Sequence, residues 1–479
     1  MGDKQTIVWF RQDLRVQDNP ALVAAAKQGK IIPIYILDDE SAGEWAMGGA
    51  SRVWLYHALK DLNTSLDGNL HLFKGNAKSV LKKLVDDHAL DGLYWNRCYE
   101  PWRVQRDKEI KSHFAEQGLD VQSFNGSLLW EPWDIRNQAG EPYKVFTPYY
   151  RKGCLNADEP RKPLPAPKDL QCLKRVNGVV SIDELGLLPA DKDWHIAMVK
   201  DWDISEQGAH NRLKDFLEDG LKGYKEGRDH PSENHVSRLS PYLHWGQISP
   251  NEVWHTSRAY AGAHHVEKDI DHFCSELGWR EFSHSLLYNF PKLPRDNLQD
   301  KFDAFPWRTN ADDLKAWQKG MTGCPMVDAG MRELWQTGYM HNRVRMIVGS
   351  FLVKNLMLHW HHGEEWFWDC LVDADLANNA ASWQWIAGCG ADAAPYFRIF
   401  NCVTQGQKFD ADGSYVRRYV PELKNLPDKY LHCPWEAPPS VLKQAGVVLG
   451  ETYPHLIADL KETRERALDA FSSLKKDAA

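Results

Sequence analysis

Long apolar runs, a secretory signal and clustered cysteines are all missing from this chain of 479 residues. No stretch of about 18 apolar residues is present to span a bilayer, and the start, MGDKQTIVWF, lacks the basic and apolar regions of a signal peptide. The nine cysteines include no CxxC pair, which gives no sign of zinc or an iron–sulfur cluster. We therefore expect a cytoplasmic, metal-free protein that binds no membrane and keeps its thiols reduced and buried.

A glycine-rich GxGxxG loop and an excess of positive charge are also absent. The first apolar run, 6–10, continues into WFRQDLRVQDNPAL, which gives no sign of the usual dinucleotide-binding loop. The net charge of −8 does not by itself suggest DNA binding, so any nucleic-acid surface has to be local. Tryptophan, in contrast, is abundant: the chain has 21, mostly in its second half.

Residues 1–130 alternate short β-rich runs with helical patterns, such as one across 51–66 that aligns leucines on one face. Strands that alternate with helices predict a parallel, doubly wound (Rossmann-like) sheet, and hence an α/β domain. A capped helix is expected to start at Pro20, after Asp18 and Asn19. The predicted strands cover residues 6–10, 30–37, 69–75, 91–96 and 119–124.

Residues 131–205 are expected to connect this domain to a second one. The segment EPRKPLPAPKDL (159–170) is too rich in proline for a helix or a central strand, so it should run extended over the surface. From 206 to 479 the β pattern disappears, which predicts one all-helical domain. The predicted helices cover 206–220, 249–262, 266–290, 312–319, 325–337, 341–359 and 455–475.

The least ordinary stretch is DADLANNAASWQWIAGCGADAAPYFRIFN, residues 373–401. Asp373 and Asp375 precede two adjacent amides, and Trp383 and Trp385 follow. Short polar residues set against large aromatic ones suit a pocket for a flat ligand with hydrogen-bonding edges. The same residues are also compatible with a buried turn that has capping Asp and Asn residues and core tryptophans. For this sequence pattern taken by itself, such a turn is commoner than a ligand pocket.

Three other segments carry polar side chains that can act together. Within 275–287, Glu276, Trp279 and Arg280 share one helical face, which is typical of a solvated surface but also of a binding wall. Within 322–356, Arg345 can pair with Asp373 and so neutralise a buried charge. The motif SRLSPYL offers two hydroxyls and an arginine before a helix, a weak signal for a diphosphate cradle.

Segments 224–250, 322–356 and 373–401 together resemble the flavin-site signature of the photolyase/cryptochrome family, and most of all its branch that repairs cyclobutane pyrimidine dimers. The resemblance implies FAD in the helical domain and ultraviolet-damaged DNA, single- or double-stranded, as partner. It also implies that the α/β domain can hold an antenna chromophore near NRCYEPWRVQRD (96–107). The identity of the antenna stays open: it can be methenyltetrahydrofolate or a deazaflavin, or the protein can lack an antenna.

The resemblance implies a role for individual residues at the cofactor. Asp373 and Asp375 would bond the polar edge of the flavin, and Asn379 would lie beside its N5 atom. Val236 stands where many relatives have threonine, so we expect altered phosphate contacts. The implied cofactor-binding residues are Tyr224, Val236, Ser237, Arg238, Leu239, Ser240, Arg280, Arg345, Asp373, Asp375 and Asn379.

Other implied roles concern the damaged base and electron transfer. Glu276 would bond the dimer and supply a proton, which requires a pKa raised by an apolar wall. Gly278 is smaller than the usual residue, so looser packing is expected behind the site. The implied substrate and DNA contacts are Glu276, Trp279, Asn342, Arg343, Met346, Trp385, Arg398 and Lys408, and the implied electron chain is Trp383, Trp360 and Trp307.

The resemblance thus implies a deoxyribodipyrimidine photo-lyase activity: reduced FAD passes an electron, driven by light, to a flipped-out dimer, which splits. The alternative is a cryptochrome photoreceptor without repair, against which Asn379 and the short ending DAFSSLKKDAA count. A nucleotide redox enzyme is disfavoured by the missing glycine-rich loop. We expect a monomer. HWHHGEEW (359–366) is interpreted as a polar loop between helices, with no metal site.

Overall fold

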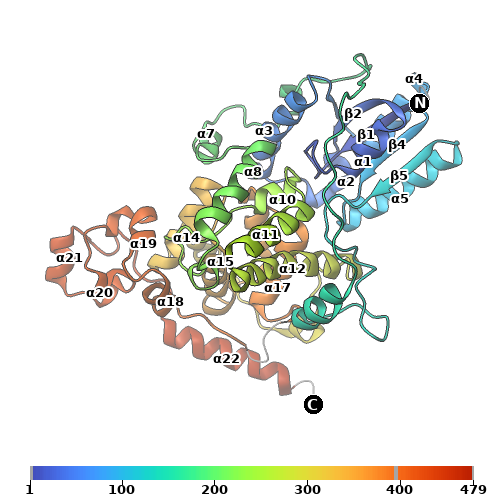
Figure 1. The fold of residues 1–479 in the computed structure, drawn as a ribbon. Helices are drawn as coiled ribbons and strands as arrows, with labels where there is room; N and C mark the ends of the chain where they lie inside the picture. Colours follow the sequence, from blue (N-terminus) through green and yellow to red (C-terminus); the bar gives the residue numbers. More distant parts are fainter. Residues whose placement is uncertain (1–3, 393–396, 477–479) are drawn as a thin grey trace.

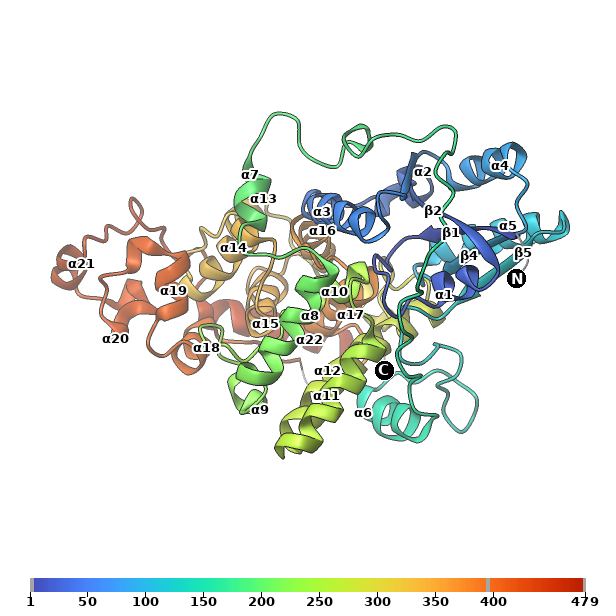
Figure 2. The same cartoon turned by 45° about the horizontal axis from the view of Figure 1, so that its top comes forward.

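A computed structural model describes residues 4–392 and 397–476. The parallel sheet lies at one end of the molecule, and helices α19 (Ser414–Tyr419) to α21 (Pro439–Ala445) lie at the other (Figure 1, Figure 2). The helices between them, from α10 (Ser240–Trp245) to α17 (Leu376–Ala387), form the central body. Residues 393–396, which belong to the stretch 373–401, lie outside the described residues.

The sheet has the strand order β3-β2-β1-β4-β5, and every neighbouring pair is parallel. The chain first builds outward from β1 on one side and then returns to the other, which is the doubly wound topology predicted. Each strand overlaps its predicted range. The strands are β1 (Lys4–Phe10), β2 (Gly29–Leu37), β3 (His71–Lys74), β4 (Gly92–Asn96) and β5 (Asp120–Phe124).

Alternation along the strands sends side chains to two different cores. Ile7 and Trp9 of β1 pack on one face of the sheet, with residues of α4 and α5, whereas Val8 and Phe10 pack on the other face, with residues of α1 and α3. Asn19 caps α1 by accepting from the Leu22 N–H, as predicted. The helices are α1 (Pro20–Ala26), the short α2 (Asp39–Ala42), α3 (Gly49–Ser65), α4 (Ala77–Asp87) and α5 (Pro101–Glu116).

One hydrophobic core continues from the sheet into the helical body. Trp54 of α3 lies 5.1 Å from Trp202 and 5.2 Å from Tyr242 of α10, measured between ring centroids. The Trp54 Nε1–H also donates to the side-chain oxygen of Gln247. All of these side chains except Gln247 belong to the same buried cluster as the β1 residue Val8. The α/β part and the helical part are therefore packed against each other over a shared interior.

Segment 131–205 contains only short helical turns between extended stretches. Its proline-rich part, 159–170, forms no helix or strand, as predicted. Asp18 fixes this part by accepting from the Leu164 N–H and by pairing with Arg161. Phe146, in contrast, is buried in the central body, so the connection also contributes to the core. The α-helical turns are α6 (Phe146–Pro148) and α7 (Trp194–Val199).

The remainder of the described chain is helical, and each predicted helix overlaps an observed one. No helix among residues 4–392 and 397–476 is both long and apolar enough to cross a bilayer. Helices α8 and α15 each end in a π-helical turn. The helices not yet given are α8 (Glu206–Asp215), α9 (Tyr224–Gly227), α11 (Pro250–His264), α12 (Glu267–Asn289), α13 (Ala311–Gln318), α14 (Pro325–Thr337), α15 (Asn342–Ser350), α16 (Trp360–Cys370), α18 (Cys402–Phe409), α20 (Asp428–Leu431) and α22 (Leu460–Lys476).

Two local predictions are wrong. The segment HWHHGEEW is no loop: His359 caps α16 by accepting from the His361 N–H, and the helix begins at Trp360. The buried-turn interpretation of residues 373–401 also fails in part, because Asp375 does act as a cap but caps a helix that includes both tryptophans. In each case a polar side chain marks a helix start rather than an irregular segment.

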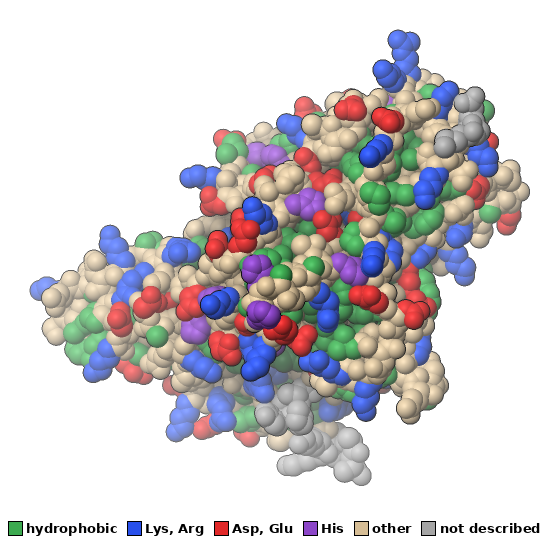
Figure 3. Space-filling model, viewed as in Figure 1, with side chains coloured by type: hydrophobic (Ala, Val, Ile, Leu, Met, Phe, Trp, Pro, Cys, Tyr) green, Lys and Arg blue, Asp and Glu red, His purple; other side chains and the backbone are tan. Residues whose placement is uncertain are grey.

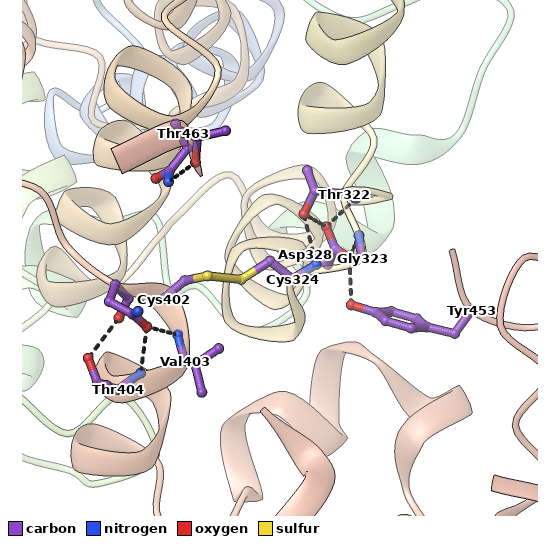
Figure 4. The surroundings of a disulfide bond; sticks show 11 residues. Thr322, Gly323, Cys324, Asp328, Cys402, Val403, Thr404, Tyr453 and Thr463 are labelled. Atoms are coloured by element: carbon purple, nitrogen blue, oxygen red, sulfur yellow. Dashed lines mark hydrogen bonds between the residues drawn. A yellow bond between two sulfur atoms is a disulfide. The ribbon is translucent and has the colours of Figure 1, made fainter. Parts of the chain in front are cut away.

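The expectation of reduced cysteines is wrong for one pair. A disulfide joins Cys324, which precedes α14, to Cys402, the first residue of α18 (Figure 4). The two are 78 positions apart, so no spacing rule indicates the pair. The neighbouring turn is held by Asp328, which accepts from the Thr322 N–H and from the Tyr453 hydroxyl, each at 2.7 Å. The other seven cysteines are free, and all but Cys172 are buried.

Candidate functional site: a cavity in the helical body

A cavity of about 510 Å³ lies between α10, α12, α15 and α17. Its volume is in the range of roughly 300–1,000 Å³ that is typical of cofactor and ligand sites. Helices distant in sequence contribute to it, and most of the candidate residues line it. These are Tyr224, Ser237, Leu239, Ser240, Glu276, Trp279, Arg280, Asn342, Arg345, Met346, Asp373, Asp375, Asn379, Trp383 and Trp385.

The first carboxylate of the pocket stretch is paired as predicted. Arg345 Nη2 lies 2.9 Å and 3.1 Å from the two carboxylate oxygens of Asp373. Burial alone would lower the pKa of Arg345, but the charge and hydrogen bonds of Asp373, with smaller contributions from Tyr339 and Glu333, together outweigh this effect and raise the pKa. The Ser240 hydroxyl also donates to Asp373, at 2.5 Å. The first residue of α10, a residue of α15 and Asp373, three positions before α17, are thus tied together at the cavity wall.

The second carboxylate, Asp375, has two histidines as partners. Its Oδ2 atom lies 3.4 Å from His244 Nδ1 and 3.4 Å from His284 Nε2. Its Oδ1 atom accepts from the backbone and side-chain amides of Asn378, both at 2.8 Å. Burial opposes ionisation, but the two imidazoles hold the pKa of Asp375 well below its usual value. The sequence analysis missed both histidines, although each lies inside a segment that it singled out.

Glu276 does not have the expected apolar wall. Its carboxylate is paired with the guanidinium of Arg228, and about a third of the side chain, 31%, is exposed. Arg228 also stacks on the Tyr224 ring, with 5.4 Å between its guanidinium carbon and the ring centroid. A carboxylate in such an ion pair is a hydrogen-bond acceptor. The predicted basis for proton donation is therefore wrong in this structure, and Arg228 is a further site residue that the sequence analysis missed.

The aromatic wall of the cavity is reinforced by segment 131–205. Phe146 stacks on Trp279 with ring centroids 3.8 Å apart and planes at 11°. Behind it, a Cβ atom at Gly278 would lie 2.5 Å from the Tyr150 ring. The small residue therefore admits a tyrosine, and the looser packing that we expected there is wrong.

The predicted phosphate loop is divided between two environments. Ser237, Leu239 and Ser240 line the cavity, whereas Val236 and Arg238 do not. The Arg238 backbone is left-handed, at φ 51°, and its guanidinium carbon lies 4.6 Å from the Trp202 ring centroid. Its side chain is thus directed into an aromatic cluster and away from the hydroxyl residues of the motif that line the cavity.

Three basic candidates lie outside the cavity lining. Arg343 is bonded to Asp229 at 2.6 Å and packs over the Phe409 ring. Lys408 packs over the same ring from α18, and both Lys408 and Arg398 are exposed. Acidic and basic side chains are interspersed over the face seen in Figure 3, in line with the net charge of −8.

The three candidate electron-chain tryptophans belong to two groups of ring contacts, one at the cavity and one around His359. Trp383 lines the cavity and contacts the rings of Phe367 and Trp317, at 5.0 Å and 6.1 Å. His359 lies between the other two: its ring centroid is 5.6 Å from that of Trp360 and 5.0 Å from that of Trp307. Trp317 and His359 were not predicted, because nothing in their sequence context separates them from core and surface residues.

A second, much smaller cavity lies at the carboxyl ends of β1 and β2. Its volume is about 40 Å³, and Trp9, Tyr35, Trp102 and Arg106 are among the residues that line it. In doubly wound folds ligands bind at this end of the sheet. The segment 96–107 does contribute to the lining, but as these side chains lie, the space suits about one water molecule rather than a chromophore.

The large cavity fits the expected FAD. Two carboxylates and two amides face apolar walls that include Trp383 and Phe367, and this combination suits a flat ring with polar edges. The hydroxyl of Ser237, together with Arg280, provides donors suited to phosphate or ribityl oxygens.

Comparison with known proteins supports the same cofactor. A family model described as the FAD binding domain of DNA photolyase matches residues 273–473, and one described as DNA photolyase matches residues 6–168. A deoxyribodipyrimidine photo-lyase of Agrobacterium fabrum is 49% identical over 98% of both chains. Cryptochrome-2 of Arabidopsis thaliana is 39% identical over 99% of this chain and 80% of the relative.

Solved structures agree with this assignment. A bacterial class III photolyase from Agrobacterium tumefaciens superposes with a TM-score of 0.95 and 48% identity, covering 99% of this chain and 98% of the other. An archaeal photolyase from Sulfolobus tokodaii with two FAD molecules superposes with a TM-score of 0.81 and 28% identity, covering 98% and 100%. The chain belongs to the photolyase/cryptochrome family and carries its FAD-binding domain.

Proposed function

We propose that this protein is a deoxyribodipyrimidine photo-lyase, a carbon–carbon lyase that uses light to split cyclobutane pyrimidine dimers in DNA. One observation supports this most: a single cavity brings the groups suited to a flavin next to Glu276, Trp279, Asn342, Met346 and Trp385. The cofactor and the damaged bases would then be adjacent, which short-range electron transfer requires.

The wall formed by α15 and α17 would hold the flavin ring. Asp373 and Asp375 would accept hydrogen bonds from its polar edge, and the Asn379 amide would serve its N5 atom, to which an amide can donate or from which it can accept. Asn379 is itself oriented by a bond from its Nδ2 to the Glu364 carbonyl, at 2.9 Å. Bound in its reduced form, FAD supplies the electron that splits the cyclobutane ring and receives it back afterwards.

Trp279 on α12, Asn342 on α15 and Trp385 on α17 would form the wall that holds the dimer. Trp279, backed by Phe146, and Trp385 offer flat surfaces on which a base can stack. The Asn342 amide can bond a pyrimidine edge, and Glu276 accepts a hydrogen bond while Arg228 holds its position. The dimer would have to leave the duplex to reach this wall. Photolyases act on bases that are flipped out of the stack in this way.

DNA would bind through basic residues near α15 and α18, namely Arg343, Arg398 and Lys408. Because phosphate contacts release counterions, affinity for DNA should fall with salt concentration.

We further propose that the protein acts as a cytoplasmic monomer on single- or double-stranded damaged DNA, with Trp383, Trp360 and Trp307 as its electron chain. An antenna chromophore, methenyltetrahydrofolate or a deazaflavin, would require Trp102 and Arg106 to move from their present positions. The division into 1–130, 131–205 and 206–479 stays a prediction.

The test is repair of ultraviolet-irradiated oligothymidine by anaerobically reduced protein. We expect base absorbance to recover under blue light and to stay unchanged in the dark. Flavin binding and photoreduction without any recovery would contradict the repair function. An NAD(P)H-dependent turnover in the dark would indicate the redox-enzyme alternative.

A cryptochrome photoreceptor is the second candidate, because plant cryptochromes also align over nearly the whole chain. The higher identity to a photo-lyase, 49% against 39%, favours repair. So does Asn379, which the family resemblance associates with repair enzymes. A protein that shows light-dependent flavin chemistry but does not bind damaged DNA tightly would favour the photoreceptor.

A further inference from the structure

Two buried imidazoles share one oxygen of Asp375 at the cavity wall. His244 comes from α10 and His284 from α12, and both approach Oδ2 at 3.4 Å. The side chains of His244, His284 and Asp375 are only 6%, 9% and 12% exposed. The common partner of the two histidines is one of the two carboxylates proposed to bind the flavin edge.

The surroundings of His284 specify its protonation state. Its Nδ1 atom lies 3.0 Å from the Arg280 carbonyl oxygen, and its Nε2 atom faces the Asp375 carboxylate. Both neighbours are acceptors, and a neutral imidazole has only one N–H to offer. Only the doubly protonated ring satisfies both. Burial lowers the pKa of His284, but the charge and hydrogen bond of Asp375, together with the hydrogen bond to the Arg280 carbonyl, outweigh this and raise the pKa above the ordinary value.

Other charged or titratable groups face His284 from the elements around it. The Arg280 guanidinium on the same helix opposes protonation, and the neighbouring carboxylate of Glu281 interacts with the imidazole. From the loop after β4, the edge of the Tyr99 ring packs on the imidazole at 6.2 Å. His244 is a further titratable group at the shared Asp375 oxygen. Asp375 is the one anion among them that lies at ion-pair distance from the His284 ring.

We propose that His284 is a buried imidazolium that keeps Asp375 ionised and oriented towards the flavin, with His244 as a second support. Both are positioning residues, because they act through Asp375. The inference rests on the proposed function for the identity of the ligand, an N–H-bearing edge of the flavin ring. When pH rises and His284 loses its proton, Asp375 loses its counter-charge, and the site becomes less suited to that edge.

The sign of the stability effect follows from linkage. An imidazole with a folded-state pKa above its unfolded value of about 6.5 stabilises the fold fully below that pH, and this contribution is lost as pH rises through the folded-state pKa. The flavin-free protein should therefore lose thermal stability over the same pH range in which it loses affinity for FAD.

The experiment compares wild type with His284→Gln, His284→Arg and His244→Gln from about pH 6 to about pH 9. FAD affinity is measured by quenching of flavin fluorescence, and thermal unfolding is measured without FAD. We expect wild-type affinity to fall about tenfold per unit of effective pKa difference. The His284→Gln variant should bind FAD weakly over the whole pH range. The His284→Arg variant, which keeps a cation, should bind FAD with little pH dependence. His244→Gln should keep the pH dependence.

Equal pH profiles for wild type and His284→Gln, in both affinity and thermal unfolding, would overturn the inference. If wild type binds no FAD at any pH, the proposed function fails instead, and the flavin-free unfolding profiles still decide whether the ion pair exists. If His284→Gln does not fold, a pH-dependent His284→Arg profile that matches wild type would overturn the inference on its own.

Discussion

Arg345 and Asp373 show how a single pair of residues holds two distant segments at the cavity. The Asp373 side chain is 3% exposed, so removal of its partner leaves a buried charge without compensation. We expect Arg345→Met to lower the free energy of unfolding by about 2–3 kcal/mol, somewhat less than for a fully buried pair because 26% of the arginine is exposed. Denaturant unfolding of flavin-free protein measures the change.

The matched control for this pair is the double variant Arg345→Met with Asp373→Asn, in which no unpaired charge remains. It should recover part of the lost stability. A double variant that is less stable than Arg345→Met alone would show that the pair does not have the role described.

Glu364 on α16 is a buried carboxyl of a different kind. Neither of its carboxylate oxygens has a hydrogen-bond partner among the described residues, and the nearest cation, Arg295, lies 3.9 Å away. Burial raises the pKa of Glu364 well above its ordinary value. The folded protein therefore holds a proton here that the unfolded chain releases above about pH 4.3, so this group makes stability fall as pH rises towards the folded-state pKa.

Glu364→Gln should remove that part of the pH dependence and be at least as stable as wild type near pH 8, because a neutral amide replaces a carboxyl that resists ionisation. Thermal unfolding at several pH values measures it. Its exposed neighbour Glu365 supplies the control, since Glu365→Gln should leave the slope almost unchanged. Identical slopes in wild type and Glu364→Gln would contradict the prediction.

At the scale of elements, the close contact between α16 and α17 depends on one glycine. A Cβ atom at Gly363 would lie 2.1 Å from the ring of Trp383. We expect Gly363→Ala to displace this ring, to cost about 1–3 kcal/mol, and to slow photoreduction of the bound flavin. Gly262 in α11 is the control: no atom lies within 4 Å of its added Cβ, so Gly262→Ala should be neutral or stabilising.

Stability and photoreduction rate of the two alanine variants are measured side by side. If Gly363→Ala behaves like Gly262→Ala in both, Trp383 is not held by this contact.

Most elements could be predicted because their signals are local. The short apolar run of β1 and the Asn19 cap of α1 depend only on neighbouring residues, and both agree with the structure. The starts of α16 and α17 were misinterpreted for a physical reason. Trp360 and Trp383 in these helices pack against other parts of the fold, and periodicity does not reveal such contacts.

The site was predicted residue by residue only where the family resemblance supplied roles. The Arg345–Asp373 pair also followed from charge reasoning and is confirmed. Arg228 and the histidines on Asp375 escaped because their partners lie at least 48 positions away, and only the packing of α10 and α12 brings them together. For the same reason the Cys324–Cys402 disulfide was not predictable.

For the whole molecule, the shared interior between the sheet and the helical body has a measurable consequence. Because Val8 and Trp54 belong to the same buried cluster as Tyr242, neither part can keep its core when the other unfolds. We expect the full chain to unfold in one cooperative transition, with coincident circular dichroism and tryptophan fluorescence. Two separated transitions would show that the α/β and helical parts are energetically independent.

The central claim is that one cavity binds the flavin and the damaged bases side by side. The most direct measurement is light-driven repair of irradiated oligothymidine by Asn342→Ala, compared with wild type at equal content of bound reduced FAD. We expect flavin binding to stay close to wild type and the repair rate to fall by about tenfold or more, as for loss of one substrate hydrogen bond to a buried partner. Unchanged repair in this variant would contradict the claim, because the dimer would then have to react outside the cavity.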